Sequence, residues 1–224
     1  MTHVGRREAV WWAQDYLFAL RAWIGSHLGA GRPDRYDGGE RRPVLIIPGV
    51  YENWRFMLPL IEGLHDAGHP VHVLPDLGHN VRPIAEGALA VRHFLEIKNL
   101  RGVAVVAHSK GGLIGKLAMT RELAGQARIA VVVAIGTPFG GARLARYLPW
   151  PALRPLIPGH SSLVELAGAQ AVNERVVSIY STFDPHIPEG SELPGATNIP
   201  LPLPGHFRIL ARPETLSAVL AAIG

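Results

Sequence analysis

Six short apolar segments constrain the fold of this chain more than any other feature of its sequence. They cover residues 44–47, 71–74, 103–107, 129–135, 176–180 and, more weakly, 196–199. Most consist of consecutive apolar, largely β-branched residues, which is typical of strands that are buried on both faces. Patterns of helical spacing fill the intervals, at residues 56–67, 84–95, 113–123 and 213–223. This alternation predicts an α/β fold with a doubly wound, mostly parallel sheet of about six strands.

The length of 224 residues fits one main domain. We expect this domain to cover residues 43–224, and residues 1–42 to form an N-terminal helix and a polar linker. Residues 137–170 contain no strand pattern but several prolines and scattered apolar side chains. We therefore expect residues 138–170 to form a short cap that is inserted after the fourth strand.

Residues 7–28 have the pattern of an amphipathic helix. One face is apolar, and the polar side chains Gln14, Asp15 and Arg21 lie elsewhere on the helical wheel; the apolar face comprises Trp12, Tyr16, Ala19, Leu20, Trp23 and Ile24. Two interpretations remain open at this point. The helix packs against the main domain, or it rests on a membrane or lipid surface, where Trp and Phe favour the interface.

Composition excludes several classes of protein. The chain has no cysteine, which rules out disulfides, thiolate metal sites and a cysteine nucleophile. Its net charge of +4 comes from scattered arginines, so nucleic-acid binding is not expected. The polar residues that interrupt the first apolar stretch argue against a signal peptide and a membrane span, and we expect a soluble, cytoplasmic protein. The eleven histidines show no His-Glu-x-x-His pair, so we expect no metal.

A serine at the end of the third predicted strand is the main candidate for chemistry. The strand ends in Ala107-His108-Ser109-Lys110-Gly111, and a helical pattern follows at once. Small residues two positions before and after Ser109 allow the sharp strand-to-helix turn of a nucleophile elbow. Such a turn lifts the hydroxyl above the edge of the sheet, so we predict that Ser109 is a catalytic nucleophile.

A serine needs a base, and the base needs an acid that orients it. The partner order for this architecture is serine, acid, histidine, each in a loop after a later strand. Asp184 is the only aspartate after Ser109, and His206 follows the last strand, so we predict these two as acid and base. His160 precedes Asp184, and His186 is too close to it in sequence. The weaker candidates for the acid are Glu165, Glu174, Glu189 and Glu192.

Backbone amides are the expected donors for the oxyanion of an acyl-transfer reaction. One donor is the amide of Lys110, directly after the serine, and the other is the amide of Val50, with Tyr51 as second choice, in the loop after the first strand. We also expect Tyr51, Phe139 and Trp150 to contact substrate, although Phe139 fits core packing equally well. Residues 76–80 either border the site or form a turn, and we favour the turn.

Together these residues resemble the α/β-hydrolase superfamily, in particular small bacterial lipases and esterases whose elbow reads Ala-His-Ser-x-Gly. The resemblance covers residues 43–224, and Gly136-Thr137-Pro138 is similar to a Gly-Thr-Pro stretch in many of these lipases. It implies a cofactor-free serine hydrolase of carboxylic esters. The first strands of the family's full sheet are missing here, so we expect a minimal sheet of six strands rather than eight. The usual His-Gly of the oxyanion loop is Pro48-Gly49 here. Lys110 stands where Met or Gln is more common, so it either favours acidic or phosphate-bearing substrates or points to solvent.

The sequence therefore predicts an esterase or lipase that acts on a small-molecule or lipid ester through an acyl-enzyme. Two alternatives remain open. The acyl group passes to another acceptor, as in an acyltransferase or thioesterase, or the fold is a non-catalytic binding module.

Overall fold

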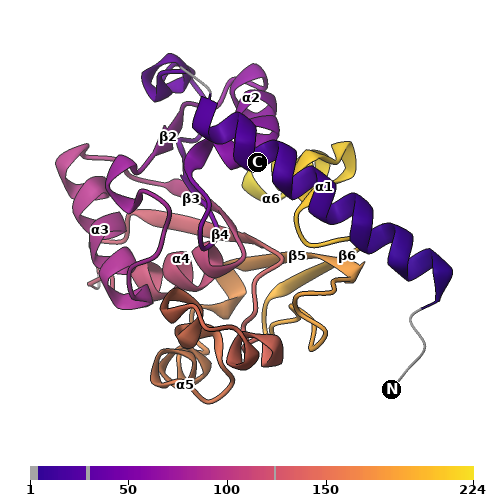
Figure 1. Cartoon of the computed structure of the whole chain (residues 1–224). Helices are drawn as coiled ribbons and strands as arrows, with labels where there is room; N and C mark the ends of the chain where they lie inside the picture. Colours follow the sequence, from indigo (N-terminus) through magenta and orange to yellow (C-terminus); the bar gives the residue numbers. More distant parts are fainter. Residues whose placement is uncertain (1–4, 29–30, 124) are drawn as a thin grey trace.

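The computed structural model of the protein describes residues 5–28, 31–123 and 125–224. Its centre is a single sheet with the strand order β2-β1-β3-β4-β5-β6, and every neighbouring pair is parallel (Figure 1). This confirms the predicted parallel α/β fold. The strands are β1 (Val44–Ile47), β2 (Val71–Val73), β3 (Val103–His108), β4 (Ile129–Ile135), β5 (Val176–Phe183) and β6 (Thr197–Pro204).

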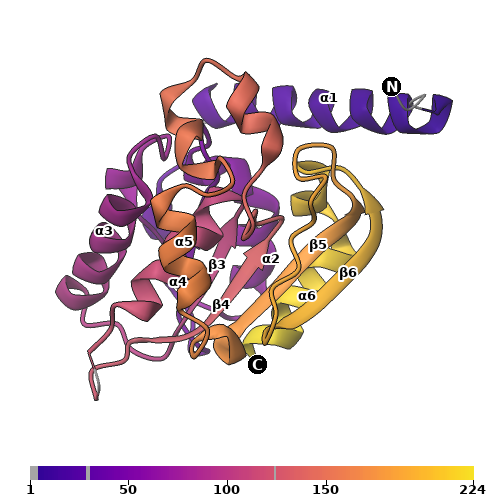
Figure 2. The same cartoon turned by 90° about the horizontal axis from the view of Figure 1, so that it is seen from below.

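Helices cover both faces of the sheet, as Figure 2 shows. One face carries α3 (Ile84–Ile97), α4 (Lys110–Thr120) and α5 (Ser161–Gly168), and the other carries α2 (Leu58–Asp66) and α6 (Pro213–Ile223). Strand side chains alternate between the two cores: Leu45 and Ile47 enter the first, whereas Val44 and Ile46 enter the second. Burial on both faces explains why the strands are continuously apolar.

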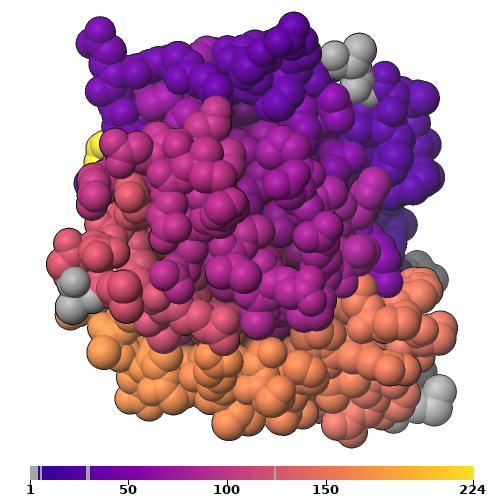
Figure 3. Space-filling model, turned by 90° about the vertical axis from the view of Figure 1, so that its left-hand side faces the viewer, coloured from indigo at the N-terminus to yellow at the C-terminus, as the bar shows by residue number. Residues whose placement is uncertain are grey.

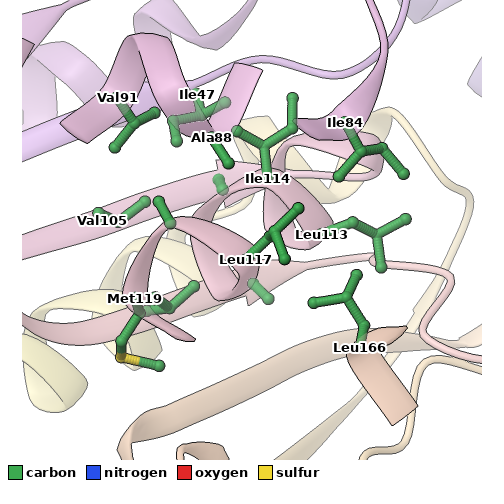
Figure 4. Close-up of a cluster of buried hydrophobic side chains, with 14 of the residues drawn as sticks. Ile47, Ile84, Ala88, Val91, Val105, Leu113, Ile114, Leu117, Met119 and Leu166 are labelled. Carbon is green, nitrogen blue, oxygen red and sulfur yellow. The ribbon is translucent and has the colours of Figure 1, made fainter. Parts of the chain in front are cut away.

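The first core lies between α3, α4 and the central strands. Figure 4 shows Val91 of α3 and Ile114 and Leu117 of α4 converging above Ile47 and Val105 of the sheet. All five side chains are fully buried, and burial of each aliphatic side chain of this size contributes roughly 1.5–3 kcal/mol to folding. The space-filling view in Figure 3 shows the outer side of this layer, with residues of α3 in magenta and the later insertion in orange along its border.

Several boundaries differ from the sequence prediction by a few residues, and two of these differences have a clear physical reason. Strand β6 continues past residue 199 through three alternating prolines to Pro204. It is an edge strand that pairs with β5 alone, so residues without an N–H are tolerated there. Helix α4 begins at Lys110 rather than at residue 113. Gly111 and Gly112 were expected to precede this helix but form its first turn. A Cβ would collide there with the Ile47 carbonyl oxygen at Gly111 and with the Thr137 side chain at Gly112, so this turn requires glycine.

The insertion after β4 contains short helices and no strand among its described residues. It consists of the 3-10 turns at Arg143–Tyr147 and Pro151–Leu156, followed by α5. Leu153, Leu156 and Leu163 anchor it in the first core, whereas Tyr147 and Trp150 remain exposed.

Helix α1 (Arg6–Leu28) docks with a different face from the one its apolar pattern predicts. Its buried positions among the described ones are both polar, Asp15 and Ser26, and Phe18 and Ala22 pack against the second core between them. The most apolar stripe is rotated from this contact face and stays largely exposed; it includes Tyr16, Leu20, Trp23 and Ile24. Asp15 lies outside the apolar stripe on the helical wheel, and its hydrogen bonds to main-chain amides turn that side of the helix inward.

The close packing at the start of α4 gives a stability prediction. A Cβ on Gly111 would lie 2.4 Å from the carbonyl oxygen of Ile47 and 2.8 Å from that of Pro48. Since these are backbone atoms of a buried strand end, Gly111→Ala should lower the free energy of unfolding by about 1–3 kcal/mol or more. Gly25→Ala is the control, because nothing lies within 4 Å of its added carbon. Gly25→Ala should leave the free energy of unfolding unchanged or raise it by up to about 1 kcal/mol. Urea denaturation measures both variants, and equal stability of Gly111→Ala and Gly25→Ala would contradict the packing argument.

Candidate active site

Ser109 occupies the sharp turn between β3 and α4. Its backbone has φ 50° and ψ −121°, an unfavourable conformation for a residue with a side chain. The Ser109 amide donates to the Ile135 carbonyl oxygen at 2.8 Å, and the Thr137 hydroxyl donates to the Ser109 carbonyl oxygen at 2.9 Å. Both partners lie at the end of β4, so the neighbouring strand holds the turn in its strained shape.

His206 and Asp184, far apart in sequence, meet beside this turn. His206 Nδ1 lies 2.7 Å from Asp184 Oδ2, and both side chains are buried. Asp184 directly follows β5, and its other oxygen accepts from the amides of His186 and Ile187. An ionised Asp184 only accepts, so Nδ1 carries the hydrogen and Nε2 of the neutral ring is left with its lone pair. No hydrogen bond joins Ser109 Oγ to His206 in this structure, although both residues line one cavity.

Burial and charge oppose each other at this pair. Burial disfavours the charged His206 ring, but the charge and hydrogen bond of Asp184 outweigh it and raise the pKa of His206 above its usual 6.5. For Asp184, burial also disfavours the charge, but His206 and the hydrogen bonds from its neighbours lower the pKa of the carboxyl. The structure therefore favours an ionised Asp184 next to a ring that accepts a proton readily.

The Gly136-Thr137-Pro138 segment serves three parts of this arrangement. Gly136 has φ 55°, and a Cβ there would lie 3.4 Å from His206 Nδ1. Thr137 binds the Ser109 carbonyl, and Pro138 lines the cavity. Three consecutive residues after β4 thus leave room for the His206 ring, hold the serine turn and line the cavity.

The predicted oxyanion donors are available. The amides of Val50 and Lys110 form no hydrogen bond with an acceptor in the described parts of the chain. Tyr51, which follows Val50, has a positive φ of 63° and shapes the tight loop after β1. Asn80 braces this loop from outside, because its Nδ2 donates to the Pro48 carbonyl oxygen at 2.7 Å. The segment 76–80 therefore supports the loop as a turn and does not line the cavity.

A buried His108–Glu52 pair lies beside the site, with Glu52 among the residues that line the cavity, and the sequence analysis did not assign it a role. His108 Nδ1 is 2.9 Å from the Glu52 carboxyl oxygens, and Nε2 is 3.1 Å from the His206 carbonyl oxygen. Glu52 also accepts from the Gly49 amide at 2.7 Å. Because the carbonyl only accepts, Nε2 carries a hydrogen. The pair joins the loop after β1, the serine turn and the His206 segment.

A cavity of about 650 Å³ opens over Ser109 and His206. Helix α1 forms one wall and the insertion forms another; Figure 2 shows α1 lying across the edge of the sheet beside the insertion. Most lining side chains are apolar or aromatic; those of α1 are Trp12, Tyr16, Ala19, Leu20 and Trp23, and those of the insertion include Leu144, Tyr147, Leu148, Trp150, Leu153 and Leu156.

The three predicted substrate contacts fall in two places. Tyr51 and Trp150 line the cavity and meet edge to face, with ring centroids 6.1 Å apart. Phe139 does not line the cavity but packs against the first core. Its neighbour Pro138 lines the cavity instead.

The Lys110 side chain neither faces substrate nor points to solvent, contrary to both expectations. It is fully buried, and its Nζ donates to the carbonyl oxygens of Asn80 and Arg82 at 2.8 and 2.6 Å. Burial lowers the pKa of this amine to about 8. The side chain does not line the cavity, so it adds no selection for acidic substrates.

His186 lies closer to the site than its sequence position suggested. Its ring contacts the ring of His206, with centroids 5.1 Å apart, and it also packs on Trp12. Burial, and then the charge of His206, lower the pKa of His186 to about 4, so this ring stays neutral near pH 7. It forms an uncharged wall next to His206.

The described helices include none that is long and apolar enough to cross a bilayer. Across the same residues, no group of three or more His, Asp and Glu side chains is arranged to hold a metal ion.

The pKa of His206 gives a test of the Asp184 contact that does not depend on activity. Histidine titration by NMR should give wild-type His206 a pKa above 6.5. In Asp184→Asn the partner charge is lost while burial remains, so the pKa should fall below 6.5. His186 is the internal control, since its signal should not titrate between about pH 6 and 8 in either protein. Equal His206 pKa values in both proteins would contradict the arrangement described here.

Comparisons with known proteins agree with this architecture. No family model matches the chain, and no curated protein matches its sequence. Solved structures do match: a Bacillus licheniformis lipase in mature form is 15% identical, with a TM-score of 0.66 over 87% of this chain and 95% of the lipase. An α/β-hydrolase enzyme from the metagenome of Mar Chica lagoon sediments is 18% identical, with a TM-score of 0.59 over 82% and 90%.

A monoacylglycerol lipase of Paleococcus ferrophilus is 17% identical, with a TM-score of 0.58 over 83% of this chain and 96% of that one. Likeness at such low identity establishes shared architecture and not shared chemistry. The chain therefore has the fold of the α/β hydrolases, among which lipases and esterases are its structural neighbours.

Proposed function

We propose that the protein is a serine hydrolase of carboxylic esters that acts through an acyl-enzyme. The observation that carries this proposal is the position of Ser109, at a strained turn in the same cavity as the 2.7 Å His206–Asp184 pair. The lipase and esterase neighbours support it at the level of the fold.

The reaction begins when Ser109 Oγ attacks the ester carbonyl carbon while His206 Nε2 takes its proton. The resulting oxyanion accepts hydrogen bonds from the amides of Val50 and Lys110. His206 then returns the proton to the leaving alcohol, and a water molecule, activated by the same ring, hydrolyses the acyl-enzyme. Asp184 holds the tautomer and stabilises the charged ring. The base contributes roughly 3–5 kcal/mol and the oxyanion donors about 3–4 kcal/mol to lowering the barrier.

The lining of the cavity supports an apolar acyl chain as the substrate group. Its walls are aromatic and aliphatic, and its 650 Å³ volume exceeds what a small acyl group such as acetyl needs. The charged group next to the serine, Lys110, is turned away from the cavity. Burial of the substrate's acyl chain therefore supplies the binding energy, at about 0.8 kcal/mol per methylene.

We further propose that the mouth of the cavity contacts a lipid surface. Exposed apolar side chains border it on both walls: Leu20 and Trp23 on α1, and Tyr147 and Trp150 on the insertion. Aromatic side chains at the end of an apolar surface favour the membrane interface. A substrate that leaves such a surface would enter between the two walls.

The esterase activity is tested with a fluorophosphonate probe and a panel of p-nitrophenyl esters from acetate to palmitate. Wild type should be labelled and should cleave the esters, and Ser109→Ala should lose labelling and at least about a thousandfold of activity. Ser161→Ala, which alters an exposed serine of α5, is the control and should behave as wild type. A folded wild type that is neither labelled nor active between about pH 6 and 9 would favour a binding module. Products formed with competing alcohols or thiols would instead indicate an acyltransferase.

Lipid contact is tested by co-sedimentation with phosphatidylcholine vesicles. Wild type should sediment with the vesicles, and Trp12→Ser/Trp23→Ser should sediment less, because aromatic surface at the mouth is lost. Ile97→Ser is the matched control, since Ile97 is an exposed apolar residue at the far end of α3. Equal sedimentation of all three proteins would remove the proposal of lipid contact.

A further inference from the structure

One carboxylate of α1 binds the chain segment that carries His206. Asp15 is fully buried, although it belongs to a helix whose neighbouring positions are mostly exposed. Its Oδ2 accepts from the His206 amide at 2.9 Å, and its Oδ1 accepts from the amides of Phe207 and Arg208 at 3.0 and 2.9 Å. Hydrogen bonds to an ionised acceptor are about twice as strong as neutral ones. This single side chain thus holds three consecutive residues that lie about 190 positions away in sequence.

The segment is shaped to receive this carboxylate. Gly205 has φ 109°, and a Cβ at this position would lie 2.4 Å from Asp15 Oδ1. On its other side, Gly205 is held by β5, because its amide donates to the Phe183 carbonyl oxygen and its carbonyl accepts from the Ser181 hydroxyl. Residues 205–208 are therefore held between β5 and α1, and neither contact alone fixes them.

Among the described residues, hydrogen bonds reach every polar atom of His206 except one. Asp15 takes its amide hydrogen, His108 donates to its carbonyl oxygen, and Asp184 accepts from ring Nδ1. The free atom is Nε2, the one that the proposed reaction uses as base. Two carboxylates on opposite sides of the same residue thus decide where Nε2 lies.

We infer that Asp15 is a positioning residue for the reaction proposed above, and that α1 is a working part of the active site. The inference rests on the proposed function. It gives the helix two tasks: its Trp12 and Tyr16 line the cavity, and its Asp15 keeps the His206 ring within reach of Ser109. Displacement of a reacting group by about 1 Å costs up to roughly a hundredfold in rate. Small movements of α1 would therefore lower the rate of the reaction.

Asp15→Asn is the sharpest variant because it keeps the shape of the side chain. One oxygen can still accept from Phe207 and Arg208, but an amide nitrogen then faces the His206 N–H, donor against donor. Gln14→Ala is the matched control: it removes the exposed hydrogen bond from the Arg208 guanidinium to Gln14 at 2.6 Å and leaves the Asp15 contacts intact.

On p-nitrophenyl acetate, which is too short to depend on the α1 wall, kcat of Asp15→Asn should fall about 10- to 100-fold, with KM within about twofold. The acid limb of its pH–rate profile should move to lower pH, because loss of a nearby negative charge lowers the pKa of His206. The other ionisable groups facing this ring, Asp184, Glu52, His186 and His108, are unchanged. Gln14→Ala should match wild type in kcat and in pH profile.

A second measurement does not depend on turnover. The Nδ1 proton of His206, shared with Asp184 at 2.7 Å, should give a downfield NMR signal that is absent in Asp184→Asn. This signal should shift in Asp15→Asn and stay in place in Gln14→Ala. If wild type cleaves no ester while the signal still shifts in Asp15→Asn, the proposed reaction is wrong and Asp15 holds the ring for another purpose.

The inference is wrong if Asp15→Asn keeps the wild-type kcat per folded molecule, the wild-type pH profile and the wild-type NMR signal. This holds even if the melting temperature of the variant falls. Asp15→Ser, which lacks both carboxylate oxygens and leaves room for water, repeats the test with a smaller side chain. Failure of both variants to fold would assign Asp15 to folding alone and would equally overturn the positioning role.

Discussion

Parallel pairing of all six strands is the constraint on which the rest of this structure depends. Because the strands run the same way, their carboxyl ends meet at one edge, and the loop after each strand reaches the same place. Gly49, Ser109, Gly136, Asp184 and His206 follow five different strands and come together there. Residues separated by up to about 160 positions thus become neighbours through backbone hydrogen bonding alone.

Buried ionisable side chains organise the loops at this edge. Loops carry amides and carbonyls that have no partner within a helix or sheet, and such groups are costly to bury. Four ionisable side chains bind them here: Asp15 the His206 segment, Glu52 the Gly49 amide, and Lys110 the carbonyls of Asn80 and Arg82. His108 completes the set by donating to the His206 carbonyl. The cost of burying these polar side chains is offset by the main-chain groups that they satisfy.

The sequence allowed the fold and the order of the chemical groups to be predicted, but not their surroundings. The strand runs are local signals, and they predicted the parallel sheet correctly. The Ser109 turn and the Asp184–His206 order are likewise local or sequential signals, and the roles assigned to these residues stay predictions. The sequence did not indicate which face of α1 contacts the domain, because an apolar stripe does not reveal three distant amides that bind Asp15. The direction of the Lys110 side chain and the core position of Phe139 likewise depend on segments far away in the chain.

By itself the sequence determined the six apolar strands, the helices between them and the glycines that permit a sharp turn at Ser109, because each of these is a preference of neighbouring residues. Only the tertiary structure decided that α1 forms a wall of the cavity and that Asp15 is buried rather than exposed. It also decided that a His108–Glu52 pair lies beside the site. Those features arise where side chains satisfy main-chain groups of another loop. Such a match depends on three-dimensional distance, which spacing along the chain does not encode.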